Sequence, residues 1–186
     1  MSNANAKNSS SSPFETIRPV IVLVAICIVA SALLGYVHAV TAPIAEANAA
    51  KKAQETYAML VPEAKEFVEV ECGVEGCVAA LEARDAAGDV VAYVIVAQSK
   101  GYGGQVPIAV AFGRKGGVKS ITAMANDETP GLGTKIAEEA YISQYVGKEA
   151  AQLEADGIDL ISGATISSKA ALSAFNIAVK AYEEVS

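Results

Sequence analysis

The sequence contains no tryptophan, one histidine and three cysteines among its 186 residues. A zinc site with several His and Cys ligands is therefore almost excluded, as is an iron–sulfur cluster held by four cysteines of this chain. Any catalytic triad would have to use His38. The scarcity of His and Cys therefore bears on these two kinds of metal site and on triad chemistry.

Basic residues are also scarce, with 14 Lys and Arg against 21 Asp and Glu and a formal net charge of −7. A nucleic-acid-binding domain needs a basic face for the phosphates, so this class is disfavoured. Hydrophobic residues make up 52% of the chain and the mean hydropathy is +0.33. A chain of this composition is too apolar to be disordered.

Much of the apolar character lies in one run without charge, residues 19–40. At about 1.5 Å per helical residue this run spans roughly 30 Å of hydrocarbon. Tyr36 and His38 lie near its end, where amphipathic rings suit a membrane interface. We therefore expect a flexible N-terminal tail over residues 1–18 and one transmembrane helix over residues 19–41.

The alternative for this run is a cleaved signal peptide. Such a peptide has an apolar segment of about 7–15 residues followed by a small-residue cleavage site, and residues 37–39 resemble such a site. The run is too long for this, which favours an uncleaved anchor. A lipoprotein signal is also disfavoured, because the bulky Ile26 precedes Cys27.

The positive charges do not fix the orientation of the anchor, because Lys7 and Arg18 precede it and residues 51–52, both lysines, follow it. Cys72 and Cys77 are separated by Gly-Val-Glu-Gly, a spacing that can close a small disulfide loop. Such a bond persists only in an oxidising compartment, which favours an extracytoplasmic domain. The alternative is two unrelated small apolar side chains.

The rest of the chain predicts a helical linker and then a compact domain. Residues 42–60 are rich in alanine, the best helix former, and Val61-Pro62 ends this linker. Strand-like runs then follow, and the β-branched stretch 90–96 has the character of a buried central strand. The runs are 66–71, 77–83, 90–96, 106–112 and 118–124.

Helices are expected to pack against this sheet. Residues 133–146 form a candidate helix, and the terminal helix has an apolar stripe from Leu172 to Tyr182 at helical spacing. Ser167 and Ser168 offer hydroxyls to cap its start. The predicted fold class is α+β, an antiparallel sheet with packed helices over residues 61–186, preceded by the transmembrane helix.

Three glycine-bearing loops are the candidates for chemistry. They are residues 101–104 (Gly-Tyr-Gly-Gly), residues 127–134 (Asp-Glu-Thr-Pro-Gly-Leu-Gly-Thr) and residues 159–165 (Asp-Leu-Ile-Ser-Gly-Ala-Thr). In the third loop the small residues allow close approach to a helix start, whose free N–H groups stabilise a phosphate. Thr165 would place its hydroxyl beside that phosphate. The alternative is an ordinary helix cap, as the other two loops could be ordinary turns.

Together the three loops resemble a known family: the G subunit of the Rnf complex and its relative, the C subunit of the sodium-pumping NADH:quinone reductase. The resemblance covers nearly everything from Pro19 onward, and the chain length favours the Rnf subunit. It implies that FMN is joined through its phosphate to the hydroxyl of Thr165, by a flavin transferase that recognises the motif with Asp159 ahead of it. It also implies an FMN-binding domain outside the cytoplasmic membrane.

The resemblance implies further FMN-binding residues in all three loops. Tyr102 or Leu132 would contact the flavin ring, and Lys100 or Lys135 could stabilise its reduced form. The expected cofactor-binding residues besides Thr165 are Ser162, Gly163, Ala164, Gly101, Tyr102, Gly103, Gly104, Glu128, Thr129, Pro130, Gly131, Leu132 and Gly133.

On this interpretation the chain is an electron carrier, not catalytic by itself, whose partners are the membrane and iron–sulfur subunits of an Rnf-type complex. In that family the complex passes electrons between ferredoxin and NAD, coupled to sodium or proton translocation. The chain has no Gly-x-Gly-x-x-Gly turn for NAD, and its apolar run has no charge for an ion path. The alternatives are the quinone-reductase subunit, an anchored flavin reductase, and a non-redox anchored binding domain.

Overall fold

The computed structural model describes residues 13–154 and 157–186. They divide into two compact units, residues up to 52 and residues 53–186. A single helix, α1 (Pro13–Leu60), begins in the first unit and ends in the second. Most of the tail expected over residues 1–18 therefore lies outside the described residues, and residues 13–18 are helical.

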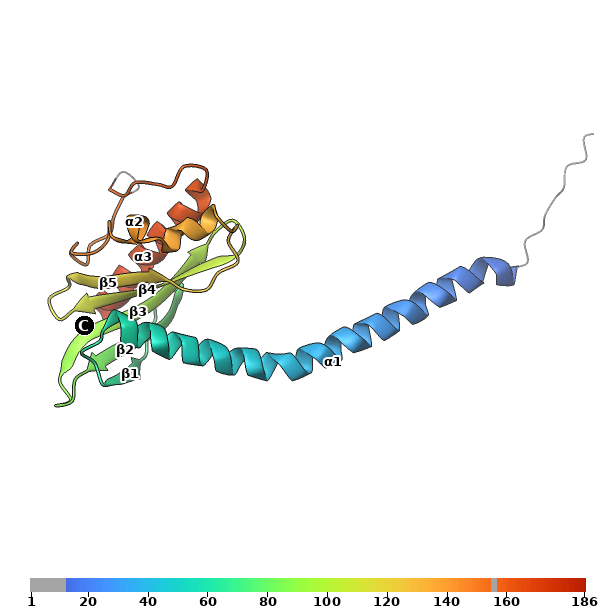
Figure 1. The fold of residues 1–186 in the computed structure, drawn as a ribbon, viewed down its shortest axis with the longest axis horizontal. Coiled ribbons are helices and arrows are strands. Elements are labelled where there is room, and N and C mark those ends of the chain that lie inside the picture. Colours follow the sequence, from blue (N-terminus) through green and yellow to red (C-terminus); the bar gives the residue numbers. More distant parts are fainter. Residues whose placement is uncertain (1–12, 155–156) are drawn as a thin grey trace, which may run out of the picture. The chain divides into compact units, whose positions relative to one another are not determined.

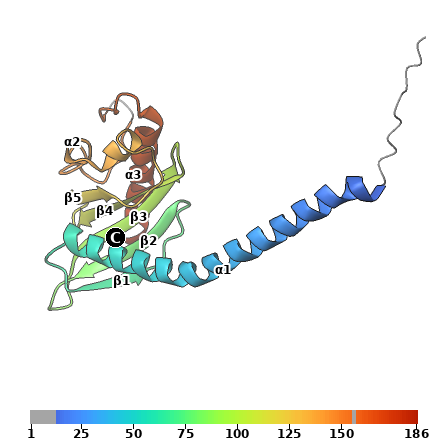
Figure 2. The ribbon, with the colours of Figure 1, turned by 45° about the vertical axis from the view of Figure 1, so that its right-hand side comes forward.

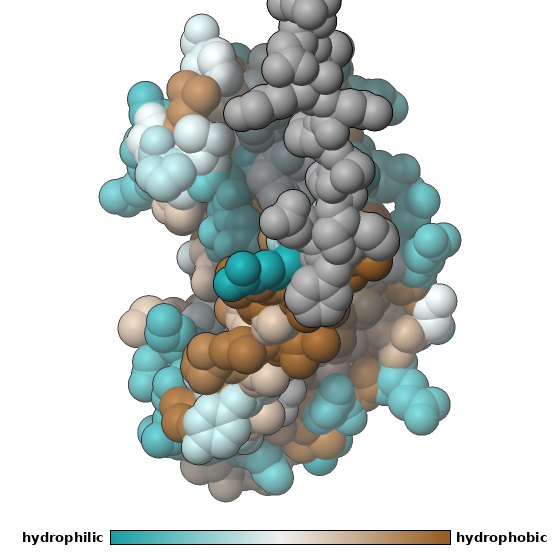
Figure 3. All heavy atoms as spheres, turned by 90° about the vertical axis from the view of Figure 1, so that its right-hand side faces the viewer, coloured by the Kyte–Doolittle hydropathy of each residue, from teal (hydrophilic) through white to brown (hydrophobic). Residues whose placement is uncertain are grey.

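The N-terminal part of α1 is the one helix, within the described ranges, that is long and apolar enough to cross a membrane. Its most apolar 18-residue window has a mean hydropathy of 2.8, and none of that window is buried. Figure 3 shows hydrophobic side chains gathered at the centre of the view. Pro19 and Pro43 lie inside the helix without ending it, and Cys27 is exposed on it.

The second unit contains an antiparallel sheet in which each strand pairs with the next along the chain, in the order β1-β2-β3-β4-β5 (Figures 1 and 2). This arrangement confirms the predicted antiparallel sheet, and the stretch 90–96 does lie in its central strand. The strands are β1 (Glu66–Val70), β2 (Cys77–Arg84), β3 (Val90–Lys100), β4 (Gln105–Gly113) and β5 (Val118–Ala123).

One face of the sheet is covered by α3 (Thr165–Val185), the predicted terminal helix. Phe175 and Val179 of its apolar stripe are fully buried. The ring of Phe112 on β4 lies between Phe175 and Tyr182, at centroid distances of 6.4 and 4.8 Å. This layer is the main hydrophobic core, and it fixes where the start of α3 lies relative to the ends of the strands.

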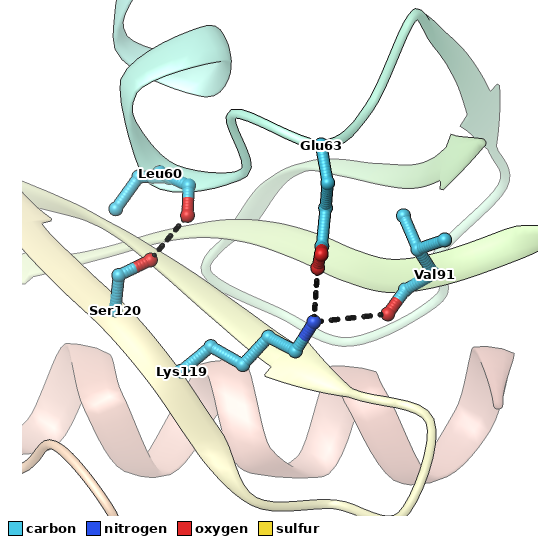
Figure 4. A network of polar contacts seen from close by, with 5 residues as sticks. All are labelled: Leu60, Glu63, Val91, Lys119 and Ser120. Atoms are coloured by element: carbon cyan, nitrogen blue, oxygen red, sulfur yellow. Dashed lines mark hydrogen bonds and ion pairs between the residues drawn. The ribbon is translucent and has the colours of Figure 1, made fainter. Parts of the chain in front are cut away.

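The opposite face is covered at its centre by the last turns of α1. Leu60 and Val61 are buried against Val94 and Ala109 in a second, smaller core. Hydrogen bonds also join this end of α1 to the sheet, since the hydroxyl of Ser120 donates to the carbonyl oxygen of Leu60 at 2.7 Å (Figure 4).

An ion pair supports the same junction. The ammonium group of Lys119 on β5 pairs with Glu63, just after α1, and donates to the carbonyl oxygen of Val91 at 3.4 Å (Figure 4). The second compact unit therefore begins inside α1, at residue 53, and includes the end of the predicted linker.

The prediction of one helix over residues 133–146 is wrong in detail. The chain there forms a short 3₁₀ helix, η1 (Gly133–Ala137), and a single α-helical turn, α2 (Glu139–Ile142). They are separated by Glu138, whose backbone is extended at φ −73° and ψ 144°. Tyr141 of α2 is buried, and its hydroxyl donates to the carbonyl oxygen of Ser168 in α3 at 2.9 Å. Packing on α3 thus outweighs the local helix preference.

Cys72 and Cys77 flank the connection from β1 to β2 and are both free thiols in the structure. Burial raises the pKa of the Cys77 thiol to about 12, with a further contribution from its hydrogen bond with Cys72. The two thiols are therefore neighbours, and the disulfide between them stays a prediction.

Candidate functional site

The three glycine-bearing loops meet around one pocket with a volume of about 560 Å³. The first loop follows β3, the second follows β5, and the third leads into α3. A pocket of this size is in the usual range for small-molecule and cofactor sites. No charged side chain of the described residues lines it; the lining residues are Tyr102, Thr129, Leu132, Gly133, Gly163, Ala164, Thr165, Ile166 and Ser167.

One wall of the pocket is the start of α3. Ala164 is the N-cap residue and offers no side-chain cap. The first backbone hydrogen bond of the helix runs from the N–H of Ser168 to the carbonyl oxygen of Ala164. Within the described ranges, the N–H groups of residues 165–167 therefore have no protein acceptor. Such groups carry partial positive charge and favour an anion.

Ser167 and Ser168 do not cap this helix, contrary to the sequence-based expectation. The helix begins two residues before Ser167, so both serines lie in its first turn. The Ser168 hydroxyl donates to the carbonyl of Ala164 at 3.0 Å and accepts from the N–H of Ile161 at 3.1 Å. The Ser167 hydroxyl donates to Glu128 at 2.5 Å. Both hydroxyls are buried and bonded, whereas Thr165 beside them is exposed.

Glu128 lies just behind the pocket and is only 3% exposed. Its Oε1 atom accepts from the N–H of Gly103 at 3.0 Å, and its Oε2 atom accepts from Ser167. Burial by itself would raise the pKa of this carboxyl. The hydrogen bonds from Ser167 and from the backbone N–H groups of residues 102–104 outweigh burial, so that the pKa of Glu128 is lowered. The group is therefore a carboxylate at neutral pH.

Glycines of the first two loops make room for this carboxylate. A Cβ atom on Gly101 would lie 2.3 Å from Oε1 of Glu128, and one on Gly133 would lie 2.7 Å from Oε2. A Cβ atom on Gly103 would lie 2.0 Å from the carbonyl oxygen of Asp127. These contacts are far too short for any side chain. The three glycines are therefore required by the protein's own packing.

The second loop is a tight turn into η1. The carbonyl oxygen of Thr129 accepts from the N–H groups of residues 132–134 at 2.9–3.3 Å. The N–H of Gly131 donates to the Thr134 hydroxyl at 2.9 Å. Gly131 has φ +73°, a conformation that side-chain-bearing residues rarely adopt. This turn holds Leu132 and Gly133 in the pocket wall.

Gln144, which sequence reasoning did not single out, fixes the beginning of the third loop. Its side chain accepts from the N–H of Asp159 at 2.7 Å and donates to the carbonyl of the same residue at 3.3 Å. The backbone of Asp159 is thus held while its side chain is exposed. A glutamine fifteen residues away carries no local signal of this contact.

Comparison with known proteins identifies the family. Residues 101–180, which contain all three loops, match the family model of the FMN-binding domain. The G subunit of the proton-translocating ferredoxin:NAD(+) oxidoreductase complex of Clostridium ljungdahlii is 30% identical over 151 residues, covering 77% of this chain and 79% of that protein. The chain belongs to this family of G subunits.

A second member of the G-subunit family is more distant but aligns over more of its length. The G subunit of the ion-translocating oxidoreductase complex of Methanosarcina acetivorans is 29% identical over 175 residues, covering 89% of this chain and 93% of that protein. Among solved structures, NqrC of Shewanella oneidensis is similar with a TM-score of 0.48 and 17% identity, over 67% of this chain and 70% of that one.

Within this G-subunit fold, the sequence-predicted site residues separate into two groups. Those that line the pocket are Tyr102, Thr129, Leu132, Gly133, Gly163, Ala164 and Thr165. Those that lie outside its wall are Gly101, Gly103, Gly104, Glu128, Pro130, Gly131 and Ser162. Ile166 and Ser167 line the pocket although the motifs did not indicate them. Lys100 and Lys135 do not line it, and Lys100 faces a separate hollow with Lys180.

Proposed function

We propose that this chain is a membrane-anchored flavoprotein subunit that carries electrons through FMN joined covalently to Thr165, within an Rnf-type ferredoxin:NAD oxidoreductase complex. The observation that carries the proposal is the pocket in which the three loops meet around Thr165 at the start of α3. The family match to an FMN-binding domain supplies the identity of the ligand.

The residues around the pocket fit the two ends of FMN. The unpartnered N–H groups of residues 165–167 suit a phosphate, which a helix start binds without any lysine or arginine. Tyr102, Leu132 and Ile166 are large apolar side chains that remain substantially exposed around the pocket, Tyr102 by 73%. Such side chains suit a flat aromatic ring, which would cover them.

Thr165 is the hydroxyl best suited to a phosphoester in this wall. Ser167 and Ser168 are buried, and their hydroxyls are already bonded to Glu128 and Ala164. The Thr165 side chain is exposed, lines the pocket and stands in the first turn of the helix. The backbone N–H groups beside it would offset the negative charge of the ester.

Bound FMN supplies transfer of one or two electrons, and the protein supplies position and electrostatics. Tyr102, Leu132 and Ile166 would hold the ring, and the free N–H groups at the start of α3 would hold the phosphate. A covalent bond prevents loss of the cofactor from a domain outside the cytoplasmic membrane, the side that we propose for residues 61–186. The apolar part of α1 keeps the domain beside its partners and raises its effective concentration there.

The partners in this proposal are the membrane and iron–sulfur subunits of the same complex, and a flavin transferase is needed for maturation. The relative from Clostridium ljungdahlii is named as part of a proton-translocating complex. A relative from Acetobacterium woodii, 32% identical over 110 residues, is named as part of a Na(+)-translocating complex. Ion translocation is a property of the whole complex in this proposal, and electron transfer is the contribution of this chain.

The proposal is tested by expressing the full chain with an active flavin transferase and examining the denatured protein on a gel. Flavin fluorescence should stay on the wild-type band and disappear in Thr165→Ala. Ser173→Ala is the matched control, because it removes an exposed hydroxyl of the same helix, α3, at a position that does not line the pocket; its band should remain fluorescent. A non-fluorescent wild-type band would contradict the proposal and favour a non-redox binding domain.

A further inference from the structure

The carboxylate of Glu128 connects the first two loops of the pocket with the first turn of α3, into which the third loop leads. Glu128 belongs to the second loop, its Oε1 atom accepts from Gly103 in the first, and its Oε2 atom accepts from Ser167, two residues after the third loop ends at Thr165. Among the described residues, every hydrogen bond between the first and second loops ends on this carboxylate. The hydrogen bond between the second loop and the start of α3 also ends on it.

The same carboxylate is not part of the pocket wall. Gly133 and Ser167 line the pocket, and Glu128 lies directly behind them, since a Cβ atom on Gly133 would come within 2.7 Å of Oε2. Its acceptor atoms are occupied by protein donors. Glu128 therefore acts on the pocket through its neighbours, and a role as a direct ligand contact does not explain its surroundings.

We infer that Glu128 is a positioning residue, whose carboxylate sets the positions of the first two loops and of the start of α3 and so gives the pocket its shape before any ligand is bound. A charged acceptor holds several N–H and O–H donors more strongly than a neutral one. Glycine at 101 and 133 allows the carboxylate to approach the backbone closely. The inference deepens the proposed function but rests on it only for the flavin measurement described below.

Amide hydrogen exchange tests the inference without any flavin. The full chain in detergent carries Thr165→Ala as background, and Glu128→Ala, Glu128→Gln or Asp127→Asn is added. Asp127→Asn is the matched control, because it removes the same charge from the neighbouring, exposed side chain. Exchange is read from peptides that cover residues 101–104, residues 165–168 and strands β3 and β4.

Glu128→Ala should accelerate exchange of residues 101–104 by about tenfold or more, since it removes a buried charged acceptor. Glu128→Gln should have a smaller effect, because the amide keeps one acceptor and the Ser167 hydroxyl can rotate to accept. Asp127→Asn should leave exchange unchanged, and β3 and β4 should stay protected in all variants.

Exchange at the wild-type rate in Glu128→Ala would overturn the inference, as would an equal effect of Asp127→Asn. If Glu128→Ala does not fold, Glu128→Gln decides. Acceleration confined to the two loop peptides supports the inference, and acceleration that is absent or spread evenly over the sheet contradicts it.

The reduction potential of bound FMN gives a second measurement. Loosened packing alone would not shift this potential in one particular direction. Glu128→Gln, with Thr165 intact, should shift the potential to more positive values, because a buried negative charge near the site is removed. Asp127→Asn should leave the potential unchanged, because water screens the exposed charge. A wild-type chain without flavin would contradict the proposed function and leave the exchange test valid. A negative shift in Glu128→Gln, or no shift, would contradict the inference.

Discussion

Glycines serve different purposes in the strand turns and in the pocket loops. Gly88 and Gly116 lie in the turns before β3 and β5 and have φ of +87° and +85°. A Cβ atom on Gly88 would meet nothing within 4 Å. Gly101 and Gly103 are absent from the positive-φ residues, but a Cβ atom on either would collide with Glu128 or Asp127. Backbone conformation thus explains the turn glycines, and also Gly131 of the second loop with its φ of +73°. Crowding explains Gly101, Gly103 and Gly133, which we call the pocket glycines.

This difference affects how a glycine motif is read. A glycine with positive φ is required by a local turn, and the neighbouring residues in the sequence indicate that turn. A glycine beside a buried carboxylate is required by a residue far along the chain, 25 positions away for Gly103 and Glu128. The resemblance implies that Gly101, Gly103 and Gly133 bind FMN; the structure shows that each of them makes room for the protein's own side chain or backbone.

The largest expected effect is that of a methyl group in the first loop. In Gly103→Ala the new Cβ atom would lie 2.0 Å from the carbonyl oxygen of Asp127, so the backbone would have to move. In Gly101→Ala the new Cβ atom would push the Glu128 carboxylate away. We expect each to destabilise the domain by about 2–3 kcal/mol. Gly104→Ala is the control within the same motif, because its Cβ atom would lie 3.8 Å from Asp127, an ordinary contact. Urea unfolding of the three variants measures this; equal stability of Gly101→Ala and Gly104→Ala would show that crowding is unimportant.

The next effect concerns the charge that the pocket glycines surround. The pKa of Glu128 is lowered in the folded protein, so its contribution to stability is complete above the ordinary Glu pKa of about 4.3 and is lost as pH falls through the lowered value. The melting temperature of wild type should therefore exceed that of Glu128→Gln by a constant margin from about pH 8 to pH 5, and the margin should shrink below about pH 4. A margin that widens in acid would contradict the lowered pKa.

A smaller effect is expected for the turn glycine Gly88. An alanine there has free space but must adopt φ +87°, which costs about 1 kcal/mol. Gly88→Asn should lose less than Gly88→Ala, because asparagine tolerates the left-handed region better. Thermal unfolding of the two variants tests this order. A loss for Gly88→Ala as large as that for Gly103→Ala would remove the distinction between the two kinds of glycine.

The smallest effect is expected far from the pocket, at the junction of α1 with the sheet. Lys119→Met removes the exposed ion pair with Glu63, and exposed pairs contribute less than about 1 kcal/mol. Because Lys119 lies outside the pocket loops, hydrogen exchange of residues 101–104 should not change in this variant. Faster exchange there would show that the pocket depends on the whole domain and not on its own contacts.

Local features made much of the fold predictable. The β-branched stretch 90–96 indicated the central strand, and the apolar stripe from Leu172 to Tyr182 indicated the terminal helix. The prediction of one helix over residues 133–146 was wrong, because the chain is extended at Glu138 between η1 and α2. Tyr141 of α2 is held by its long-range contact with Ser168. Packing with a distant element decided the local structure in that case.

The candidate site was predictable in its loops and not in its internal connections. The three loops were recognised as motifs, and the structure brings them to one pocket. Ser167 was interpreted as a helix cap, and its bond to Glu128, 39 positions away, has no sequence signal. The backbone contacts of Gln144 with Asp159 were missed for the same reason. Side-chain contacts between distant loops are fixed by the fold and cannot be read from spacing.

Mass spectrometry of the native protein tests the central claim most directly. The chain is isolated from its own membrane and digested, and the peptide that contains Thr165 is fragmented to locate any added mass. The account predicts this peptide heavier by one FMN less one water, with the addition on Thr165. An unmodified Thr165, or FMN attached at Ser162 or another hydroxyl, would contradict it.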